Sequence, residues 1–244
     1  MYYVLHIFPR LNIGLNKNEF ITFVGGGGKT TSIFKLAKEL KELNRSILIT
    51  TTTAMYVPDK KNYDYFFLEK TSKKFKQKKP SITVYGGKIE NRKIKNTDVL
   101  ELENIFFRGQ FDYILVEGDG SKGKPIKAPE AYEPVVPKNT TKTIGVIGLD
   151  SLGRKINEEN VHRVEKLKNI VKANSNEKVD NDVIIRLVLN KNGLFKDSQG
   201  EKILFLNKAI DKERIKAGLE IRRKLNEKGF HNVVVGDIKT KKIY

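Results

Sequence analysis

One short segment combines the residue types that bind a nucleotide phosphate: Gly25, Gly26, Gly27, Gly28, Lys29, Thr30 and Thr31. Glycines let the backbone approach an anion closely, a lysine can neutralise phosphate oxygens, and a hydroxyl can bind magnesium. An apolar run, 20–24, precedes the glycines, and apolar residues at helical spacing follow them over 30–43. A helix that begins at a glycine loop turns free N–H groups and positive dipole charge toward an anion. The segment therefore predicts a nucleoside triphosphate site.

The spacing of these residues departs from the standard phosphate-loop pattern, G-x-x-x-x-G-K-[ST]. Phe23 stands where the first glycine belongs, so the match covers only the second half of the pattern, with a loop two residues tighter. The dinucleotide pattern G-x-G-x-x-G fits worse, because its third glycine would fall on Thr30 and no acid closes the second strand. A nicotinamide or flavin site is thus disfavoured. The simpler alternative is that the glycines only form a tight turn between a strand and a helix.

Two carboxylates follow a second apolar run. Glu117 and Asp119 lie at the carboxyl end of the expected strand 112–117, which is where ligands collect in an open parallel sheet. Residues two apart in an extended segment point to one face. We therefore expect Glu117, Asp119 and Thr30 to hold magnesium, and Lys29, Glu117 and Asp119 to act in catalysis. The alternative is a polar turn in which Asp119 only satisfies backbone N–H groups.

The next segment, 121–130, contains three lysines and two prolines. Proline limits the freedom of a loop, so binding an anion there would cost less ordering entropy. Lys122 and Lys127 are therefore candidates for contact with a phosphate or a cofactor. An ordinary basic surface loop would have the same composition.

Polar residues follow two other expected strands. Thr52, within the run Thr50–Thr53, could reach magnesium or a terminal phosphate as part of a switch segment, or could simply end a strand. Asn207 and Lys208 resemble part of the guanine-reading motif of GTPases, but its aspartate comes one residue late, at Asp211. Asp211 is equally suited to cap the following helix. The choice between ATP and GTP therefore stays open.

The composition limits the classes of protein and of chemistry. The 244 residues suffice for a single α/β domain, 1–244, with room for a small C-terminal lobe from about residue 175. Cysteine is absent, which excludes disulfides and thiol chemistry on this chain, and three histidines disfavour a multi-histidine metal site. No apolar run is long enough for a membrane span, and residues 1–8 lack the features of a signal peptide. We expect a cytoplasmic protein without membrane contact.

The net charge of +18 favours an anionic partner. The alternative explanation of this charge is a lysine-rich surface that has no specific partner. The densest basic run, 73–79, contains a single aromatic residue and is not followed by interleaved aromatics, so a nucleic-acid patch is disfavoured. The expected partner is a nucleotide.

Strands and helices are expected to alternate along the chain. This order predicts an α/β phosphate-loop nucleotide-binding fold, with a mostly parallel sheet and helices on both faces. Helices are expected at 30–43, 97–107, 158–173, 180–190 and 211–228. Strands are expected at 20–24, 46–50, 64–68, 82–85, 112–117, 143–148, 203–206 and 232–235.

Several short segments occur together in an order that is typical of one family. They are 24–31, 50–53, 116–121, 127–129, 133–137, 148–150, 161–163 and 206–208. The chain resembles the selenium cofactor biosynthesis proteins, also described as accessory proteins of selenium-dependent molybdenum hydroxylases (YqeC-like). The resemblance runs from about residue 20 to the C-terminus and is most specific over 116–137.

The resemblance implies a nucleotide-dependent accessory protein that uses Mg2+ with ATP or GTP. It would help mature the selenium-containing cofactor of molybdenum hydroxylases, and its partner would be such a hydroxylase or its cofactor. Without cysteine, the chain cannot carry selenium on a thiol of its own, so energy transduction, activation of the cofactor or delivery are the expected roles. The alternatives are a small-molecule kinase acting on an anionic substrate, a basic nucleic-acid-binding protein without catalysis, and a nucleotide-dependent scaffold.

Overall fold

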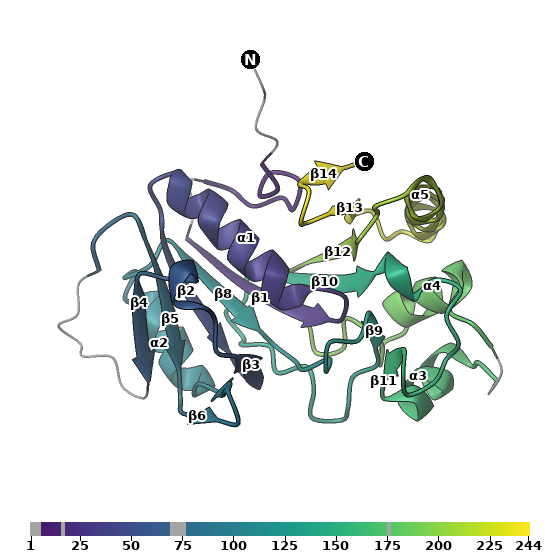
Figure 1. The fold of residues 1–244 in the computed structure, drawn as a ribbon, viewed down its shortest axis with the longest axis horizontal. Helices are drawn as coiled ribbons and strands as arrows, with labels where there is room; N and C mark the ends of the chain where they lie inside the picture. Colours follow the sequence, from purple (N-terminus) through teal and green to yellow (C-terminus); the bar gives the residue numbers. More distant parts are fainter. Residues whose placement is uncertain (1–5, 16–17, 69–76, 175–176) are drawn as a thin grey trace, which may run out of the picture.

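The computed structural model of the protein describes residues 6–15, 18–68, 77–174 and 177–244, and its main element is a nine-stranded sheet (Figure 1). The strands of this sheet are β1 (Glu19–Gly25), β2 (Ser46–Thr51), β4 (Tyr65–Leu68), β5 (Ser81–Gly86), β8 (Tyr113–Glu117), β10 (Lys142–Gly148), β12 (Glu201–Asn207), β13 (Val233–Asp237) and β14 (Lys242–Ile243). They follow the order β14-β13-β12-β10-β1-β8-β2-β5-β4. Every pairing is parallel except that of β13 with β14.

The described helices connect the parallel strands. They are α1 (Lys29–Glu42), α2 (Val99–Phe107), α3 (Val164–Val171), α4 (Asn181–Leu189) and α5 (Lys212–Glu227). Two small sheets lie beside the main one, formed by β3 (Ala54–Tyr56), β6 (Ile89–Glu90) and β7 (Lys93–Lys95), and by β9 (Ile126–Lys127) and β11 (Val161–His162). The result is a mixed α/β fold.

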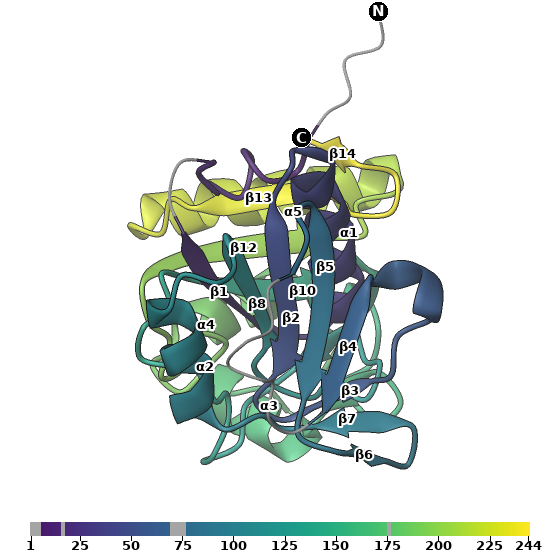
Figure 2. The same ribbon diagram turned by 90° about the vertical axis from the view of Figure 1, so that its left-hand side faces the viewer.

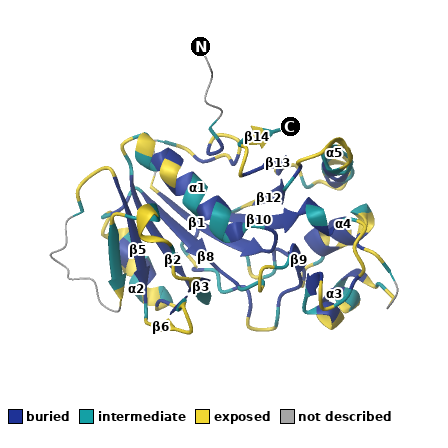
Figure 3. Ribbon diagram, in the orientation of Figure 1, coloured by how far each residue is buried: buried dark blue, intermediate teal, exposed yellow. Residues whose placement is uncertain are grey.

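Helices cover both faces of the large sheet. Ile21 and Phe23 of β1 pack in one core cluster with the apolar residues of α1, whereas Phe20 and Val24 belong to clusters that include α2, α4 and α5. This alternation follows from the period of two in a strand, and Figure 2 shows the sheet between the two helix layers. Figure 3 shows that the central strands are buried along their length, while the helices are exposed on their outer sides.

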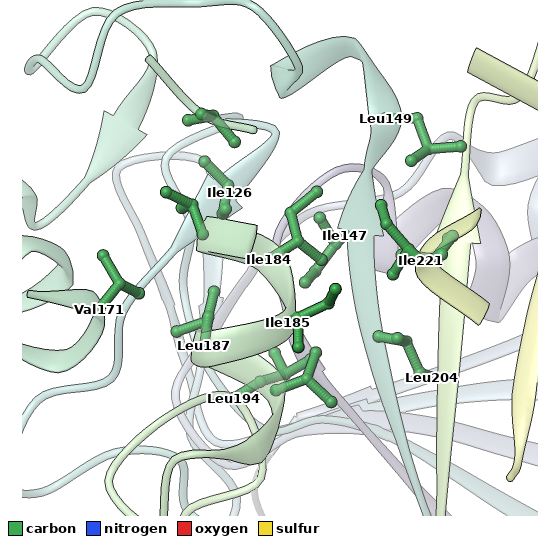
Figure 4. Close-up of a cluster of buried hydrophobic side chains, with 14 of the residues drawn as sticks. Ile126, Ile147, Leu149, Val171, Ile184, Ile185, Leu187, Leu194, Leu204 and Ile221 are labelled. Atoms are coloured by element: carbon green, nitrogen blue, oxygen red, sulfur yellow. The ribbon is translucent and has the colours of Figure 1, made fainter. Parts of the chain in front are cut away.

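The core on the side of α3, α4 and α5 is the largest apolar cluster. This cluster combines Ile184 and Leu187 of α4 with Ile147 of β10, Ile126 of β9 and Ile221 of α5 (Figure 4). Residues from both sides of position 175 therefore share one core. This packing holds β9 and the ends of β10 and β12 in fixed positions around the glycine loop.

The far end of α1 anchors both ends of the described chain. Glu39 is fully buried. Its carboxylate accepts hydrogen bonds from the backbone N–H groups of Ile7 (2.8 Å) and Phe8 (3.4 Å) and pairs with Lys241 (3.2 Å). A buried carboxylate is stable only with such partners. The helix that begins at the glycine loop is thus also fixed at its other end.

One expected helix is wrong in its first half. The sequence predicts a helix over 158–173, but Val161 and His162 form β11, which pairs with β9, and the helix begins only at Val164. Arg163 separates the two with a left-handed backbone (φ 68°). The pairing with β9, a tertiary contact, overrides the local helical pattern. The basic run 73–79 lies partly outside the described residues, and none of the described helices combines the length and apolar composition needed to cross a membrane.

Candidate functional site

The N-terminus of α1 has no cap. Gly28, at the N-cap position, offers no side chain, and the first turn contains no acid. By contrast, Asp98, Asp180 and Asp211 cap α2, α4 and α5 through hydrogen bonds to backbone N–H groups. The first N–H groups of a helix have no acceptor within the helix, so the first turn of α1 presents donors and positive dipole charge to its surroundings.

The glycine loop is held in shape by its own N–H groups. The N–H of Gly26 donates to the carbonyl of Val146 (2.9 Å), and that of Gly27 donates to the carbonyl of Lys124 (3.0 Å). Gly27 has a φ of +76°, and a Cβ atom there would lie 2.1 Å from the backbone nitrogen of Gly148. Only glycine fits this approach. Gly25 and Gly26 therefore lie beneath the loop, away from the cavity, whereas Gly27 and Gly28 line the cavity above it.

The ammonium group of Lys29 is buried beneath the loop. It donates to the carbonyl of Gly25 (2.6 Å) and lies 3.1 Å from Asp119 and 3.8 Å from Glu117. Burial alone would lower the pKa of Lys29, but the charges of Asp119 and Glu117 outweigh it and raise the pKa. Lys29 therefore stays positively charged at the edge of the cavity.

Glu117 and Thr30 form the oxygen-rich part of the site. Because β8 pairs with β1, Glu117 lies level with Phe23, and its carboxylate accepts a hydrogen bond from the Thr30 hydroxyl (2.6 Å). Burial raises the pKa of Glu117 despite the nearby Lys29. Both residues line the cavity, so both could coordinate a magnesium ion that also binds phosphate oxygens and water.

Asp119 is placed differently from Glu117. Both of its oxygens accept from the N–H of Gly25 (3.1 and 3.0 Å), and they also pair with Lys29 and Lys127 (3.1 Å each). These protein contacts match the alternative in which Asp119 satisfies a backbone N–H group. The structure thus brings Asp119 to Lys29, but as a support beneath the loop and not in the lining of the cavity.

Lys127 continues this buried network away from the cavity. Its ammonium donates to Glu133 (2.6 Å) and to the carbonyl of Gly120 (2.8 Å), and Glu133 pairs in turn with Arg163. Although burial would raise it, the pKa of Glu133 falls to about 2, because Arg163 and Lys127 stabilise its charged form. The expected direct contact of Lys127 with a phosphate does not fit this placement, since Lys127, unlike Lys29, is not part of the cavity lining.

The cavity above the loop has a volume of about 300 Å³ and is strongly basic. Lys122, a candidate from the sequence, lies in its lining. Glu117 is the acid of its described lining, which also carries six lysines from five segments of the chain: Lys29, Lys93, Lys122, Lys124, Lys208 and Lys239. A concave surface of one charge sign attracts a polyanion of matching size.

A second cavity of about 490 Å³ adjoins the first, and the two share Gly28, Thr31, Lys208 and Lys239. Asn207 lies between them. Its side chain donates to the carbonyl of Gly27 (2.9 Å) and accepts from the N–H of Ile238 (3.0 Å). Lys208 pairs with Asp150 (2.8 Å). The cavity is large enough and polar enough at its edges for a nucleoside.

Two residues from the sequence patterns lie outside these cavities. Asp211 caps α5, because its carboxylate accepts from the N–H of Arg214 (2.8 Å). The hydroxyl of Thr52 donates to the carbonyl of Val135 (2.7 Å), and its N–H donates to the carbonyl of Glu117 (3.2 Å). The structure therefore does not bring Thr52 to the place where a phosphate or magnesium would lie.

The described side chains do not form a metal site by themselves. Within the described part of the chain, no three histidine or acidic side chains lie close enough together to hold a metal ion. Thr30 and Glu117 fit a magnesium ion that takes its other ligands from phosphate and water, which is usual for Mg2+ at nucleotide sites.

The relation to known proteins is visible in sequence. A model of the YqeC protein family matches residues 21–165. A protein of Escherichia coli (strain K12) that is named "Uncharacterized protein YqeC" is 30% identical over 233 residues, which cover 93% of this chain and 91% of that protein. The chain belongs to the YqeC family. No solved structure matches it.

The YqeC family match covers only part of the site. It includes the glycine loop, Glu117, Asp119, Lys127 and Glu133, whereas Asn207 and Lys208 lie beyond it. Sequence reasoning did not identify Lys93 or Lys239 as site residues. They come from β7 and from the segment after β13, and neither lies in a local motif. Lys124 lies in the basic loop 121–130, whose composition was the available signal.

Proposed function

We propose that this YqeC-family chain binds the Mg2+ complex of ATP or GTP through a phosphate loop of the shortened type. The observation that carries the proposal is the uncapped N-terminus of α1, which opens into the basic cavity beside Lys29, Thr30 and Glu117. A helix N-terminus with free N–H groups and a lysine in its first turn suits a phosphate. A glycine turn with a purely structural role would not need six lysines around it.

The residues divide the work of binding between them. Gly28 and the first turn of α1 would hold phosphate oxygens through backbone N–H groups, while the N–H of Gly27 stays bound to the carbonyl of Lys124. Lys29 would neutralise the β- and γ-phosphate oxygens, with Lys122 and Lys208 closing the cavity from the side. Magnesium bound at Thr30 and Glu117 would supply further charge neutralisation.

Asp119, Lys127 and Asn207 support the site without lining its phosphate-facing part. Asp119 holds the N–H of Gly25 and the ammonium of Lys29, and Lys127 holds Asp119. Asn207 ties the carbonyl of Gly27 to the backbone of Ile238. Positioning of this kind matters because a phosphate site acts through preorganised donors.

We further infer that the bound nucleotide serves the maturation of the selenium-containing cofactor of molybdenum hydroxylases in the cytoplasm. The support is the resemblance carried by segments such as 116–137, together with membership of the YqeC family. The partner would be a molybdenum hydroxylase or its cofactor. With no thiol on the chain, its part is to use or sense the nucleotide and not to carry selenium on a cysteine.

The proposal predicts the behaviour of Lys29→Ala. Without the ammonium group, affinity for non-hydrolysable ATP or GTP analogues should fall about 100-fold, because a charge-assisted contact to phosphate is lost. Calorimetric titration with and without Mg2+ measures this and identifies the base. Lys216→Ala, on the exposed side of α5, is the matched control. Unchanged binding in folded Lys29→Ala protein, or no binding of either analogue to the unaltered protein, would contradict the proposal.

A further inference from the structure

A third cavity lies on the other side of the phosphate loop from the Asn207 cavity. It is a groove of about 380 Å³ between the outer side of α1 and the segment that follows β3, lined among others by Phe34, Lys35, Lys38, Tyr56, Val57 and Pro58. We call it the Tyr56 groove. None of the roles described so far uses it.

The Tyr56 groove has an apolar, partly aromatic floor. Tyr56 is 64% exposed and Val57 is 37% exposed, although both are large apolar residues. Phe34 and Pro58 extend the same surface. Exposed aromatic surface in a concave place is suited to a ring, which can stack on it.

The groove is lined by two lysines, Lys35 and Lys38, and by one acid, Asp59, which pairs with Lys61 (3.8 Å). The ammonium of Lys38 donates to the side-chain oxygen of Asn62 (2.8 Å), which is uncharged. Lys93, which lines the neighbouring cavity above the glycine loop, lies over the ring of Tyr56 at 4.8 Å. Among the ion pairs of the described residues, none involves Lys35, Lys38 or Lys93. Such cations are available to an anionic group of a ligand.

The groove and the phosphate cavity are neighbours, because Thr30, Thr31 and Tyr56 line both. The phosphate cavity already has six lysines against one glutamate. Since magnesium would neutralise part of a triphosphate's charge, the lysines of the groove exceed what one nucleotide needs. The nucleoside has a separate place, the cavity of about 490 Å³ at Asn207.

We propose that the Tyr56 groove binds a second ligand beside the nucleotide, a small molecule with a planar ring and an anionic group. The position next to the phosphates rests on the proposed function, whereas the chemistry of the ligand rests on the groove alone. Ring stacking on Tyr56 and Phe34 and charge contact with Lys35 and Lys38 define the ligand class. This places the anionic acceptor at the Tyr56 groove and not at the loop that contains Lys122 and Lys127.

The test uses a fluorescent planar anion, 7-methoxycoumarin-3-carboxylate, and its uncharged analogue 7-methoxycoumarin. Fluorescence anisotropy of each probe is measured with the full chain, in the presence of Mg2+ and a saturating non-hydrolysable nucleotide analogue. The carboxylate should bind more tightly than the neutral probe. In Lys35→Glu/Lys38→Glu its affinity should fall about tenfold or more, because two cations at the groove become anions.

The control variant Lys202→Glu/Lys216→Glu has the same change in net charge at exposed positions outside the cavities described. It should keep probe affinity within about twofold. Nucleotide affinity of Lys35→Glu/Lys38→Glu, measured by calorimetry, should also stay within about twofold, since neither lysine lines the phosphate cavity. The thermal midpoint confirms that both variants are folded.

Three results would overturn the groove proposal: equal affinity for the charged and neutral probes, full probe affinity in Lys35→Glu/Lys38→Glu, or displacement of the probe by the nucleotide analogue. The last would make the groove the nucleoside site. Failure of the proposed function is distinguishable. A protein that binds no nucleotide, yet binds the carboxylate in a way that Lys35→Glu/Lys38→Glu abolishes, would support the groove and refute the nucleotide site.

Discussion

Asp119 fixes the positions of its charged neighbours from beneath the glycine loop. Its carboxylate lies between two buried ammonium groups, those of Lys29 and Lys127, and also accepts from the N–H of Gly25. These contacts hold Lys29 beneath the loop instead of letting it extend freely. The position of Lys29, which we propose to bind phosphate, therefore depends on a salt-bridge network that reaches as far as Glu133 and Arg163.

Glu117→Gln separates magnesium binding from phosphate binding. The amide oxygen of glutamine can still accept from the Thr30 hydroxyl, but the negative charge that favours Mg2+ is lost. We expect the gain in nucleotide affinity from Mg2+ to shrink about tenfold or more. Calorimetric titration with and without Mg2+ measures the gain. An unchanged Mg2+ effect would remove Glu117 from the magnesium site.

Lys127→Met should destabilise the fold far more than the loss of a surface pair. Two buried carboxylates, Asp119 and Glu133, lose a partner, and breaking a buried pair in this way costs about 3–5 kcal/mol. Lys41→Ala breaks the half-exposed pair with Asp64 and should cost about 0–1 kcal/mol. Urea unfolding at neutral pH compares the two. Similar losses would show that the Lys127 network contributes little to stability.

For single residues, the sequence predicted which side chains lie together better than it predicted what each of them does. Pattern and spacing predicted that Lys29, Thr30 and Glu117 would meet, and the parallel pairing of β8 with β1 brings them together. The roles of Asp119, Lys127 and Thr52 depend on which atoms surround each side chain. That information comes from contacts between residues distant in sequence, such as Lys127 with Asp119, and no local pattern contains it.

The glycine loop is the element on which the site depends. Gly27 and Gly153 have the same φ, +76°, but a Cβ atom at Gly27 would lie 2.1 Å from the nitrogen of Gly148, whereas one at Gly153 meets nothing within 4 Å. A substitution at Gly153 therefore tests backbone strain alone, whereas one at Gly27 adds a steric clash.

Gly153→Ala should cost about 1–2 kcal/mol of stability, the strain of a left-handed alanine. Gly27→Ala should cost several kcal/mol more, because the loop must move away from β10, and it should also abolish nucleotide binding. Unfolding curves and calorimetry test both effects. Equal stability of the two variants would mean that the loop can shift freely, contrary to the packing described here.

The long elements were predictable and the short ones were not. Buried strands such as β1 and β10 and amphipathic helices such as α1 and α5 have strong periodic patterns, and the structure confirms them within a few residues. Strands of two or three residues, such as β3, β9 and β11, have too few side chains to form a pattern. Such strands form because of the strands with which they pair. For that reason the first half of the helix expected at 158–173 is wrong.

At the scale of the whole molecule, the structure shows where part of the positive charge gathers, in a chain whose net charge is +18. Six lysines from five segments lie around one cavity, although they are spread over more than 200 positions of the chain. A cavity of that size suits a small polyanion better than a flat nucleic-acid surface. Sequence composition could indicate the sign of the partner's charge, but the convergence follows from the topology of the sheet.

The stability of the protein should fall in mildly acidic solution. The pKa of His162 is lowered to about 4, first by burial and then by the charges of Arg163, Lys127 and Lys122. Between pH 6.5, the usual pKa of histidine, and about pH 4, His162 is protonated in the unfolded chain but not in the folded chain. The free energy of unfolding therefore decreases as the pH falls through this window. Glu133 adds a second loss between about 4.5 and about 2.

Urea unfolding midpoints measured from pH 7 to pH 4 test this prediction. His162→Gln should flatten the slope in that range, because the titrating group is removed, and the exposed His231→Gln should leave it unchanged. An identical slope in His162→Gln would show that other groups cause the acid sensitivity.

The anchoring of Glu39 has a practical consequence for anyone who trims the protein for crystallisation. This carboxylate lies ten residues from Lys29 along α1, about 15 Å behind the loop, and its partners are Ile7, Phe8 and Lys241. Glu39 thus ties residues near both ends of the described chain to the end of α1 that is distant from the cavity. Cutting away residues 6–8 would remove both backbone N–H partners of this buried carboxylate, and cutting away 238–244 would remove its ammonium partner.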